Sequence, residues 1–177
     1  MDEAPDPELA GRGGIQATGK SDAPADASID APADANARLP YATLAQALRG
    51  LLREWLALDA ADLAPWRDVI AEALGPNAGL LVPLLPELGR VLDPLPWLPD
   101  TQSREAGPRL HLALHSLLTA LAHAAQPLTL CFDDIQWLDT ETATLLHQLL
   151  TDPATTSLLV VCAYRSHEVD DGHTVTR

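Results

Sequence analysis

Apolar residues recur at intervals of three and four along most of the chain from residue 39 onward. This spacing is typical of helices that bury one face, and it predicts a helix over residues 41–58 and a long amphipathic helix over 109–125. A shorter helix is expected over 66–74, with Pro65 near its start and Gly75-Pro76 as its stop. The proline-rich stretch that follows predicts only helical turns, at 80–85 and 87–92, joined by ordered loop.

Two segments have a continuous apolar pattern instead. Residues 128–132 and 158–163 are runs of apolar or β-favouring residues, which suit strands buried on both faces of a parallel sheet. Between them, Asp139 or Thr140 can cap a helix whose first turn contains Glu141. Four leucines predict its buried face: Leu145, Leu146, Leu149 and Leu150. The order strand, helix, strand predicts a parallel crossover and therefore an α/β fold.

The composition changes at about residue 37. Residues 1–37 are rich in Asp, Ala, Pro and Gly and contain a short repeat, DAPADASI followed by DAPADANA. Such a segment has too little to bury, so we expect it to be disordered. We expect an ordered domain over residues 38–170 and a polar tail over 171–177.

The formal net charge of −14 argues against direct binding of DNA or RNA, because the surface repels phosphate backbones. No signal peptide and no membrane-spanning run is seen, so the cytoplasm is the expected compartment. The two cysteines, Cys131 and Cys162, are expected to be small buried residues in neighbouring strands.

Charged residues follow both predicted strands. Asp133 and Asp134 end the first strand, and Arg165 ends the second. Parallel strands bring these residues to one edge of the sheet, where α/β folds bind ligands. Asp133 can hold Mg²⁺ against nucleotide phosphates, Asp134 can orient a water, and Arg165 can sense the phosphate. This is the physical content of a Walker B motif; for Arg165 the alternative is a surface salt bridge to Asp134 or Glu168.

A candidate phosphate loop lies near the N-terminus. The segment GIQATGKS fits GxxxxGK[ST], which makes four residues candidate phosphate ligands: Gly14, Gly19, Lys20 and Ser21. Neither flank suits this interpretation, since no buried strand precedes the segment and Pro24 soon follows it. A phosphate lysine needs a helix N-terminus behind it.

Several blocks together resemble a known family. FDDIQWLD, a Leu-rich helix, LLTDP, a Leu/Val strand and AYRSHEV look like the AAA-type, origin-recognition-like ATPase domain of the STAND group of P-loop NTPases. Such domains occur in bacterial transcriptional regulators and in hybrid serine/threonine/histidine kinases. LPYATLAQALRGLLREWL and EALGPNAGLLVPLLPEL resemble the segment that the kinase-linked domains carry before Walker B. The resemblance covers roughly residues 39–170.

The resemblance implies a three-layer α/β P-loop fold with a helical insertion before the Walker B strand, and an ATP-binding switch that uses Mg²⁺. By position, Asp133 corresponds to the metal acid, Asp134 to the second acid and Arg165 to the sensor. Trp137 and Asp139 match the end of the motif, with Trp137 as a packing residue. Other domains or proteins of a signalling system are the implied partners.

The resemblance also offers a second interpretation of GIQATGKS. In the kinase-linked domains, the second strand ends in a Gly-Lys-aromatic-Asp-Gln element, which residues 15–22 match with Ser21 in place of the aromatic. Lys20 is then not a phosphate lysine, and the first strand, the true phosphate loop and the first helix are missing from the chain. A genuine phosphate loop and a chance match remain as alternatives. The expected function is a partial ATP-binding regulatory domain that lacks a working Walker A motif and is inactive as an isolated ATPase, or a non-catalytic interaction module that binds no nucleotide.

Overall fold

Three parallel strands form the sheet of this protein. The computed structural model describes residues 14–21, 40–94, 106–125 and 127–165. The strands β1 (Ile15–Lys20), β2 (Leu128–Asp133) and β3 (Leu158–Cys162) lie in the order β1-β2-β3. Their register pairs Lys20 with Asp133 and Phe132 with Cys162, so all three carboxyl ends meet at one edge. The predicted parallel crossover between the two apolar runs is therefore confirmed, and the fold is α/β.

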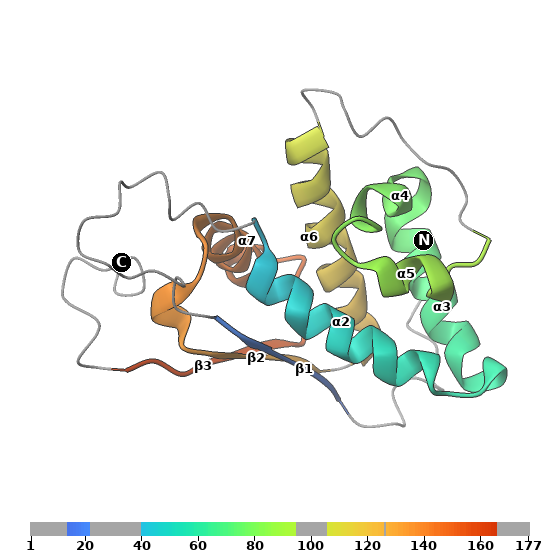
Figure 1. Ribbon diagram of the computed structural model, residues 1–177, viewed down its shortest axis with the longest axis horizontal. Coiled ribbons are helices and arrows are strands. Elements are labelled where there is room, and N and C mark those ends of the chain that lie inside the picture. The colour runs from blue at the N-terminus through green and yellow to red at the C-terminus, as the bar shows by residue number, and fades with distance from the viewer. Residues whose placement is uncertain (1–13, 22–39, 95–105, 126, 166–177) are drawn as a thin grey trace.

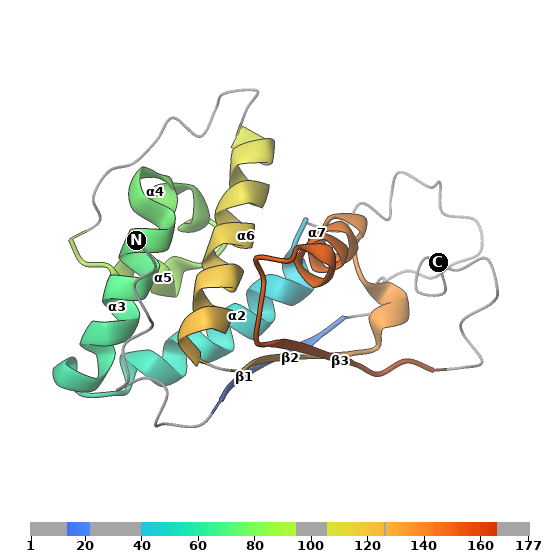
Figure 2. The ribbon, with the colours of Figure 1, turned by 180° about the vertical axis from the view of Figure 1, so that it is seen from behind.

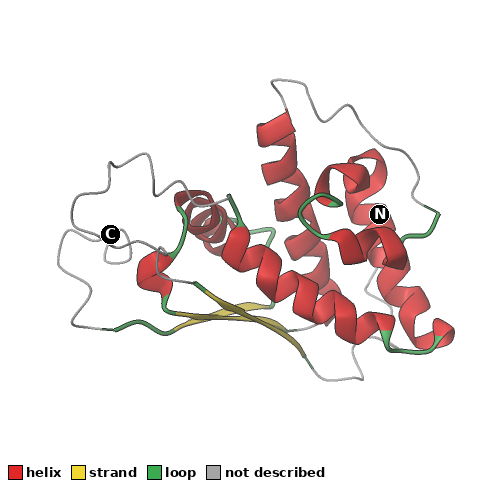
Figure 3. Ribbon diagram, viewed as in Figure 1, coloured by secondary structure: helices red, strands yellow, loops and turns green. Residues whose placement is uncertain are grey.

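The helices lie on one face of this sheet (Figures 1 and 2). Helix α2 crosses over β1, and Figure 3 shows the remaining helices stacked above the same face. The helical elements are α2 (Ala42–Leu56), α3 (Ala60–Leu74), η2 (Gly75–Asn77), α4 (Ala78–Leu81), α5 (Pro86–Val91), α6 (Ala106–Ala125), η3 (Ile135–Trp137) and α7 (Thr140–Thr151). Helices α3 to α6 form the insertion between β1 and β2, together with α2.

Helix α3 is longer than the sequence pattern predicts. It begins at Ala60 rather than near residue 66, because the Asp59 side chain caps it by accepting a hydrogen bond from the Asp62 N–H at 3.0 Å. Pro65 therefore lies inside the helix, beyond its first turn. The predicted stop is correct, since the helix ends before Gly75 at a positive φ of 46°.

The hydrophobic core lies between the sheet and the helices. Residues Leu44, Leu48 and Leu51 of α2 are buried at intervals of three and four, as the pattern predicts. The rings of Trp55 and Trp66 stack with centroids 4.7 Å apart, which joins α2 to α3. From the sheet, the core receives the alternate residues Leu128, Leu130 and Phe132 of β2, and it is completed by α6 residues Leu114, Leu117, Leu118 and Leu121.

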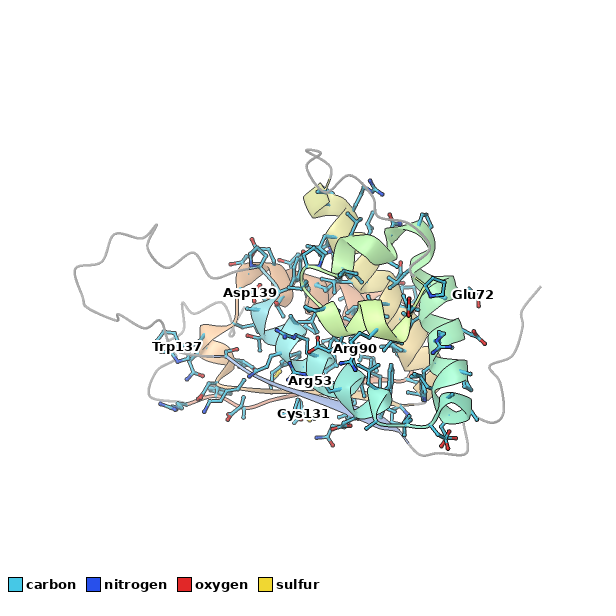
Figure 4. The ribbon with its side chains drawn as sticks, turned by 45° about the vertical axis from the view of Figure 1, so that its right-hand side comes forward. Arg53, Glu72, Arg90, Cys131, Trp137 and Asp139 are labelled. Atoms are coloured by element: carbon cyan, nitrogen blue, oxygen red, sulfur yellow. The ribbon has the colours of Figure 1, made fainter. Side chains whose placement is uncertain are left out.

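The second face of the sheet is not covered by any described helix, and here the predicted two-sided burial is wrong. In β3, Leu159 and Val161 keep 52% and 47% of their surface exposed. Cys131 lies half-buried on the side of the sheet away from the helices (Figure 4). Cys162, which is expected to be buried, is exposed at the end of β3, although its register with Phe132 places it on the helical face. Leu150 of α7, expected in the buried face, is 58% exposed. The apolar run of β3 therefore exceeds what the described residues bury.

The boundary expected at residue 37 is also different. Residues 15–20, which fall within the segment expected to be disordered, form the edge strand β1. Strand β1 pairs with β2 and packs against α2, so it is part of the ordered domain. The repeat over residues 22–37, the N-terminal 13 residues and the polar tail lie outside the described residues.

Candidate functional site

The carboxyl end of β2 carries two acids with different environments. Asp133 is exposed, and its Oδ1 accepts a hydrogen bond from the Asp134 N–H at 2.9 Å. Asp134 adopts a left-handed backbone conformation with φ at 54°, which Asp tolerates better than most residues. This turn carries the Asp134 side chain to a position where only 6% of the residue is exposed. One strand end therefore presents one carboxylate to solvent and holds the other in the protein.

Two cations from the neighbouring strands contact Asp134. The Arg165 Nε lies 3.0 Å from Oδ1, and the Lys20 Nζ lies 3.6 Å from Oδ2. Arg165 Nη2 also donates to Oδ2 at 3.5 Å. The buried acid is thus neutralised by side chains that are themselves about half exposed, 54% for Arg165 and 55% for Lys20. Because both cations reach solvent, their attraction to Asp134 is screened more than that of a fully buried ion pair.

The structure brings Asp133, Asp134 and Arg165 together as the sequence predicts. It also adds Lys20, whose pairing with Asp134 was not predicted. The salt-bridge alternative for Arg165 and the phosphate-sensing alternative both involve its contact with the buried Asp134. Glu168, the other partner considered for the salt bridge, lies outside the described residues. The contact alone is therefore compatible with both roles.

Residues 14–21 have the geometry of a strand. Backbone hydrogen bonds tie Ile15 N–H to Pro127 O and Ser21 N–H to Asp133 O, both at 3.0 Å. The Lys20 N–H points outward and donates to Gln46 Oε1 at 2.7 Å. A phosphate loop instead curls its N–H groups around one anion and leads into a helix. This extended geometry agrees with the interpretation in which GIQATGKS forms the end of the second strand, rather than a phosphate loop.

Gly19 is required by packing in this strand. A Cβ added to Gly19 would lie 2.5 Å from Thr43 O and 3.3 Å from the Ala47 Cβ. The strand therefore approaches α2 more closely than a larger residue allows. The adjacent Ser21 is 2% exposed, and its hydroxyl is 3.0 Å from that of Thr43. Two of the four residues that match the phosphate-loop pattern, Gly19 and Ser21, thus have structural contacts with α2.

Asp139 joins the starts of two helices at this edge of the sheet. One of its carboxylate oxygens accepts from the N–H groups of Tyr41 and Thr142, at 3.0 and 2.9 Å, and the other accepts from the Thr142 hydroxyl. It is the N-cap of α7, as predicted, but its contact with Tyr41 at the start of α2 could not be read from local sequence. Burial, with Glu141 and Asp139 nearby, raises the pKa of Tyr41.

A metal ion at this site would be coordinated mainly by waters and phosphates rather than by protein side chains. Among the described residues no group of three or more His, Cys, Asp and Glu side chains is arranged to hold a metal ion. Asp133 retains an oxygen, Oδ2, that takes no hydrogen bond from the described part of the chain. Mg²⁺ is commonly bound by one or two carboxylates with waters and phosphates, and a single exposed Asp133 fits that pattern.

In the described ranges, no helix is long and apolar enough to cross a membrane.

Comparison with known proteins agrees with this fold. The AAA ATPase domain family matches residues 14–161, a range that begins at the first residue before β1 and ends in β3. The hybrid signal transduction histidine kinase G of Dictyostelium discoideum is 27% identical over 111 residues, which is 63% of this chain and 3% of that protein. No solved structure matches significantly. Since the family covers most of the chain, this protein belongs to the AAA ATPase domain family, whose members generally bind ATP with Mg²⁺ and act in regulation.

Proposed function

We propose that the described residues form the metal-binding and sensor side of a nucleotide site in a regulatory ATPase domain. Asp133 is the carboxylate that holds Mg²⁺, Asp134 is the second acid that orients a water, and Arg165 senses the terminal phosphate. Mg²⁺ supplies charge neutralisation for the phosphates when it is bound. Asp134 and Arg165 then act on the water and the terminal phosphate, which the metal and Asp133 hold in position.

One observation carries this proposal: the buried Asp134 is held by cations from both adjacent strand ends. The cations are half exposed and on long side chains, so an arriving phosphate can compete for them without unfolding the sheet. Arg165 is the better phosphate partner, because its guanidinium binds two oxygens at once. Exchange of Arg165 between Asp134 and a phosphate gives the domain two states.

The proposal assigns no phosphate-binding role to Gly14, Gly19, Lys20 or Ser21. It is supported by the strand geometry of residues 15–20 and by the packing of Gly19 against Thr43. The phosphates are then bound by a loop other than residues 14–21. On this assignment Lys20 serves to neutralise Asp134.

The setting is a signalling protein of the STAND group in the cytoplasm, with other signalling domains as partners. This chain spans about 3% of the length of the curated relative that it matches. The assignment to a signalling protein therefore concerns far more than the aligned part. The support is the printed name of the relative, a hybrid signal transduction histidine kinase, together with the blocks that resemble kinase-linked domains.

The proposal is tested by titrating fluorescently labelled ATP against the full chain, with and without Mg²⁺. We expect weak binding that Mg²⁺ strengthens, and we expect Asp133→Asn to remove the effect of Mg²⁺. Asp68→Asn, at an exposed position of α3, is the matched control and should change nothing. If Asp133→Asn and Asp68→Asn behave alike, Asp133 is not the metal carboxylate.

A second candidate, a non-catalytic interaction module, is favoured by the uncovered apolar face of β3. Parallel sheets are usually covered on both faces, and Leu159 and Val161 would gain from a partner. The same titration separates the two functions. Absence of binding at millimolar ATP, with the chain folded, favours the interaction module.

A further inference from the structure

A second cationic site lies on the helical side of the molecule, between α2 and the segment that joins α4 to α5. A cavity of about 340 Å³, open to solvent, is lined by Ala42, Ala45, Gln46, Arg49, Arg53, Pro83 and Leu84. It lies between α2 and the α4–α5 connection, and Figure 4 shows Arg53 on the α2 side. Its size is at the lower end of the range for small-molecule sites. None of the residues proposed above for nucleotide chemistry lines it.

The two arginines are held in place by one buried acid. Glu87 of α5 is 8% exposed, and its Oε2 lies 3.1 Å from the Arg49 Nε. The other oxygen, Oε1, lies 2.8 Å from both Nε and Nη2 of Arg53. Because Arg49 and Arg53 are four residues apart on α2, both project from the same side of the helix. Glu87 thus fixes two guanidinium groups but neutralises only one positive charge.

Arg49 has donors that no described residue uses. It binds Glu87 through Nε alone, and among the residues that the structure describes neither of its terminal nitrogens has a hydrogen-bond partner. The Arg49 side chain is 40% exposed and that of Arg53 is 61% exposed. Anchored guanidinium groups with free N–H donors at the rim of a cavity match the two oxygens of a carboxylate or phosphate.

The rest of the cavity is largely apolar. Pro83 and Leu84 form one wall and Ala42 and Ala45 form another, with the exposed amide of Gln46 between them and the arginines. A bare inorganic anion would leave these walls in contact with water. The combination of an apolar wall with two directed cations therefore selects an anion that carries a small apolar group.

We propose that this cavity, the Arg49–Arg53 pocket, binds a small organic anion in which a phosphate or carboxylate is attached to a compact apolar group. The anionic group contacts the terminal nitrogens of Arg49 that no described residue uses and lies beside the Arg53 guanidinium, and the apolar group lies against Pro83 and Leu84. The site is independent of the nucleotide chemistry proposed for the strand ends. It is connected to β1 through Gln46, whose Oε1 accepts a hydrogen bond from the Lys20 N–H.

The test uses phenyl phosphate as the probe against the full ¹⁵N-labelled chain, followed by NMR. Saturable shifts of the Arg49 and Arg53 Nε–H signals, with a dissociation constant of about 1 mM or below, are expected. Benzoate should shift the same Nε–H signals if the pocket also binds carboxylates. Inorganic phosphate is expected to bind at least about fivefold more weakly and benzyl alcohol not detectably, since each lacks one half of the recognised chemistry.

Variants decide whether the arginines are responsible. Arg49→Gln should weaken phenyl phosphate at least about tenfold, by loss of a charge-assisted contact, while Arg90→Gln on the neighbouring α5 should leave it within about twofold. Arg49→Lys, which keeps the charge and the fold, should weaken it by an intermediate factor. The proposal is overturned if the shifts do not saturate, if benzyl alcohol binds as well as phenyl phosphate, or if the folded Arg49 variants bind like the native chain.

Discussion

Two buried carboxylates in this protein are each held by two cations, and they differ in how the chain brings the cations together. Glu87 is contacted by Arg49 and Arg53, which are one helical turn apart on α2. Asp134 is contacted by Lys20 and Arg165, which come from the ends of two strands far apart in the sequence. The first cluster therefore forms wherever α2 and α5 pack. The second exists only when the three-stranded sheet is complete.

The difference bears on the ligand exchange that we propose at Asp134. Burial alone would raise the pKa of Glu87, but its own backbone N–H and the hydrogen bonds from Arg49 and Arg53 outweigh burial and hold the pKa below its usual range. Glu87 therefore remains charged and fixed at neutral pH. Asp134 lies in a turn with a positive φ, and its two cations come from separate strand ends rather than from one helix.

The largest stability effect is expected from separating the strand that carries Lys20 from α2. Gly19→Ala places a Cβ 2.5 Å from the backbone oxygen of Thr43, so β1 must shift away from the helix. We expect a loss of about 2–3 kcal/mol in the free energy of unfolding, measured by urea denaturation. The control is Gly50→Ala, where an added Cβ meets nothing within 4 Å; it should stabilise helix α2 by up to about 1 kcal/mol. Equal effects of the two variants would contradict the packing role of Gly19.

Glu87→Ala should give the next largest effect. It leaves Arg49 and Arg53 adjacent without their shared acid, and we expect a loss of about 2 kcal/mol in the free energy of unfolding. Urea denaturation at pH 7 measures it, with Glu72→Ala on the exposed side of α3 as the control. A loss no larger than that of the control would show that the Glu87 cluster does not hold α5 on α2.

The same cluster predicts a dependence on pH. Because the pKa of Glu87 is lowered in the folded state, its contribution is fully present above the pKa of the unfolded chain and is lost as the pH falls through the lower folded value. The stability difference between the native chain and Glu87→Gln should stay constant from pH 7 down to about 5 and shrink below about 4. Denaturation curves of both proteins across this range provide the measurement. A difference that grows on acidification would contradict the assigned direction.

Asp134→Asn should have a smaller effect on stability. Asn tolerates the left-handed backbone conformation as well as Asp does, and the two released cations are already half exposed. We expect a loss of about 1 kcal/mol or less by urea denaturation. A loss as large as that for Glu87→Ala would mean that the two clusters are equally structural, and it would remove the basis for treating Asp134 as a ligand-exchange site.

Much of the strand-end site could be predicted from the sequence. Asp133, Asp134 and Arg165 follow apolar runs directly, so their meeting depends only on parallel pairing, which the intervening helix implies. The contribution of Lys20 could not be predicted in this way, because it requires residues 15–20 to pair with β2 across more than one hundred residues. The contact of Asp139 with Tyr41 is non-local for the same reason.

Other features could not be decided from local patterns. The strand state of GIQATGKS is offered only by the family resemblance, because the segment is short and weakly apolar and its strand is formed by contacts with β2 and α2. The apolar run of β3 indicates burial on two faces, whereas the described residues cover only one. The arginines of the Arg49–Arg53 pocket lie on the polar face of a helix, where a sequence pattern indicates only solvent.

The central claim is that Asp133, Asp134 and Arg165, rather than the segment 14–21, carry the nucleotide chemistry of the described residues. Titration of labelled ATP with Mg²⁺ against the native chain, Lys20→Ala and Asp133→Asn tests it directly. We predict that Lys20→Ala binds within about fivefold of the native chain, since only one exposed ion pair is lost, and that Asp133→Asn no longer responds to Mg²⁺. Loss of binding in Lys20→Ala, with the response to Mg²⁺ intact in Asp133→Asn, would contradict the claim.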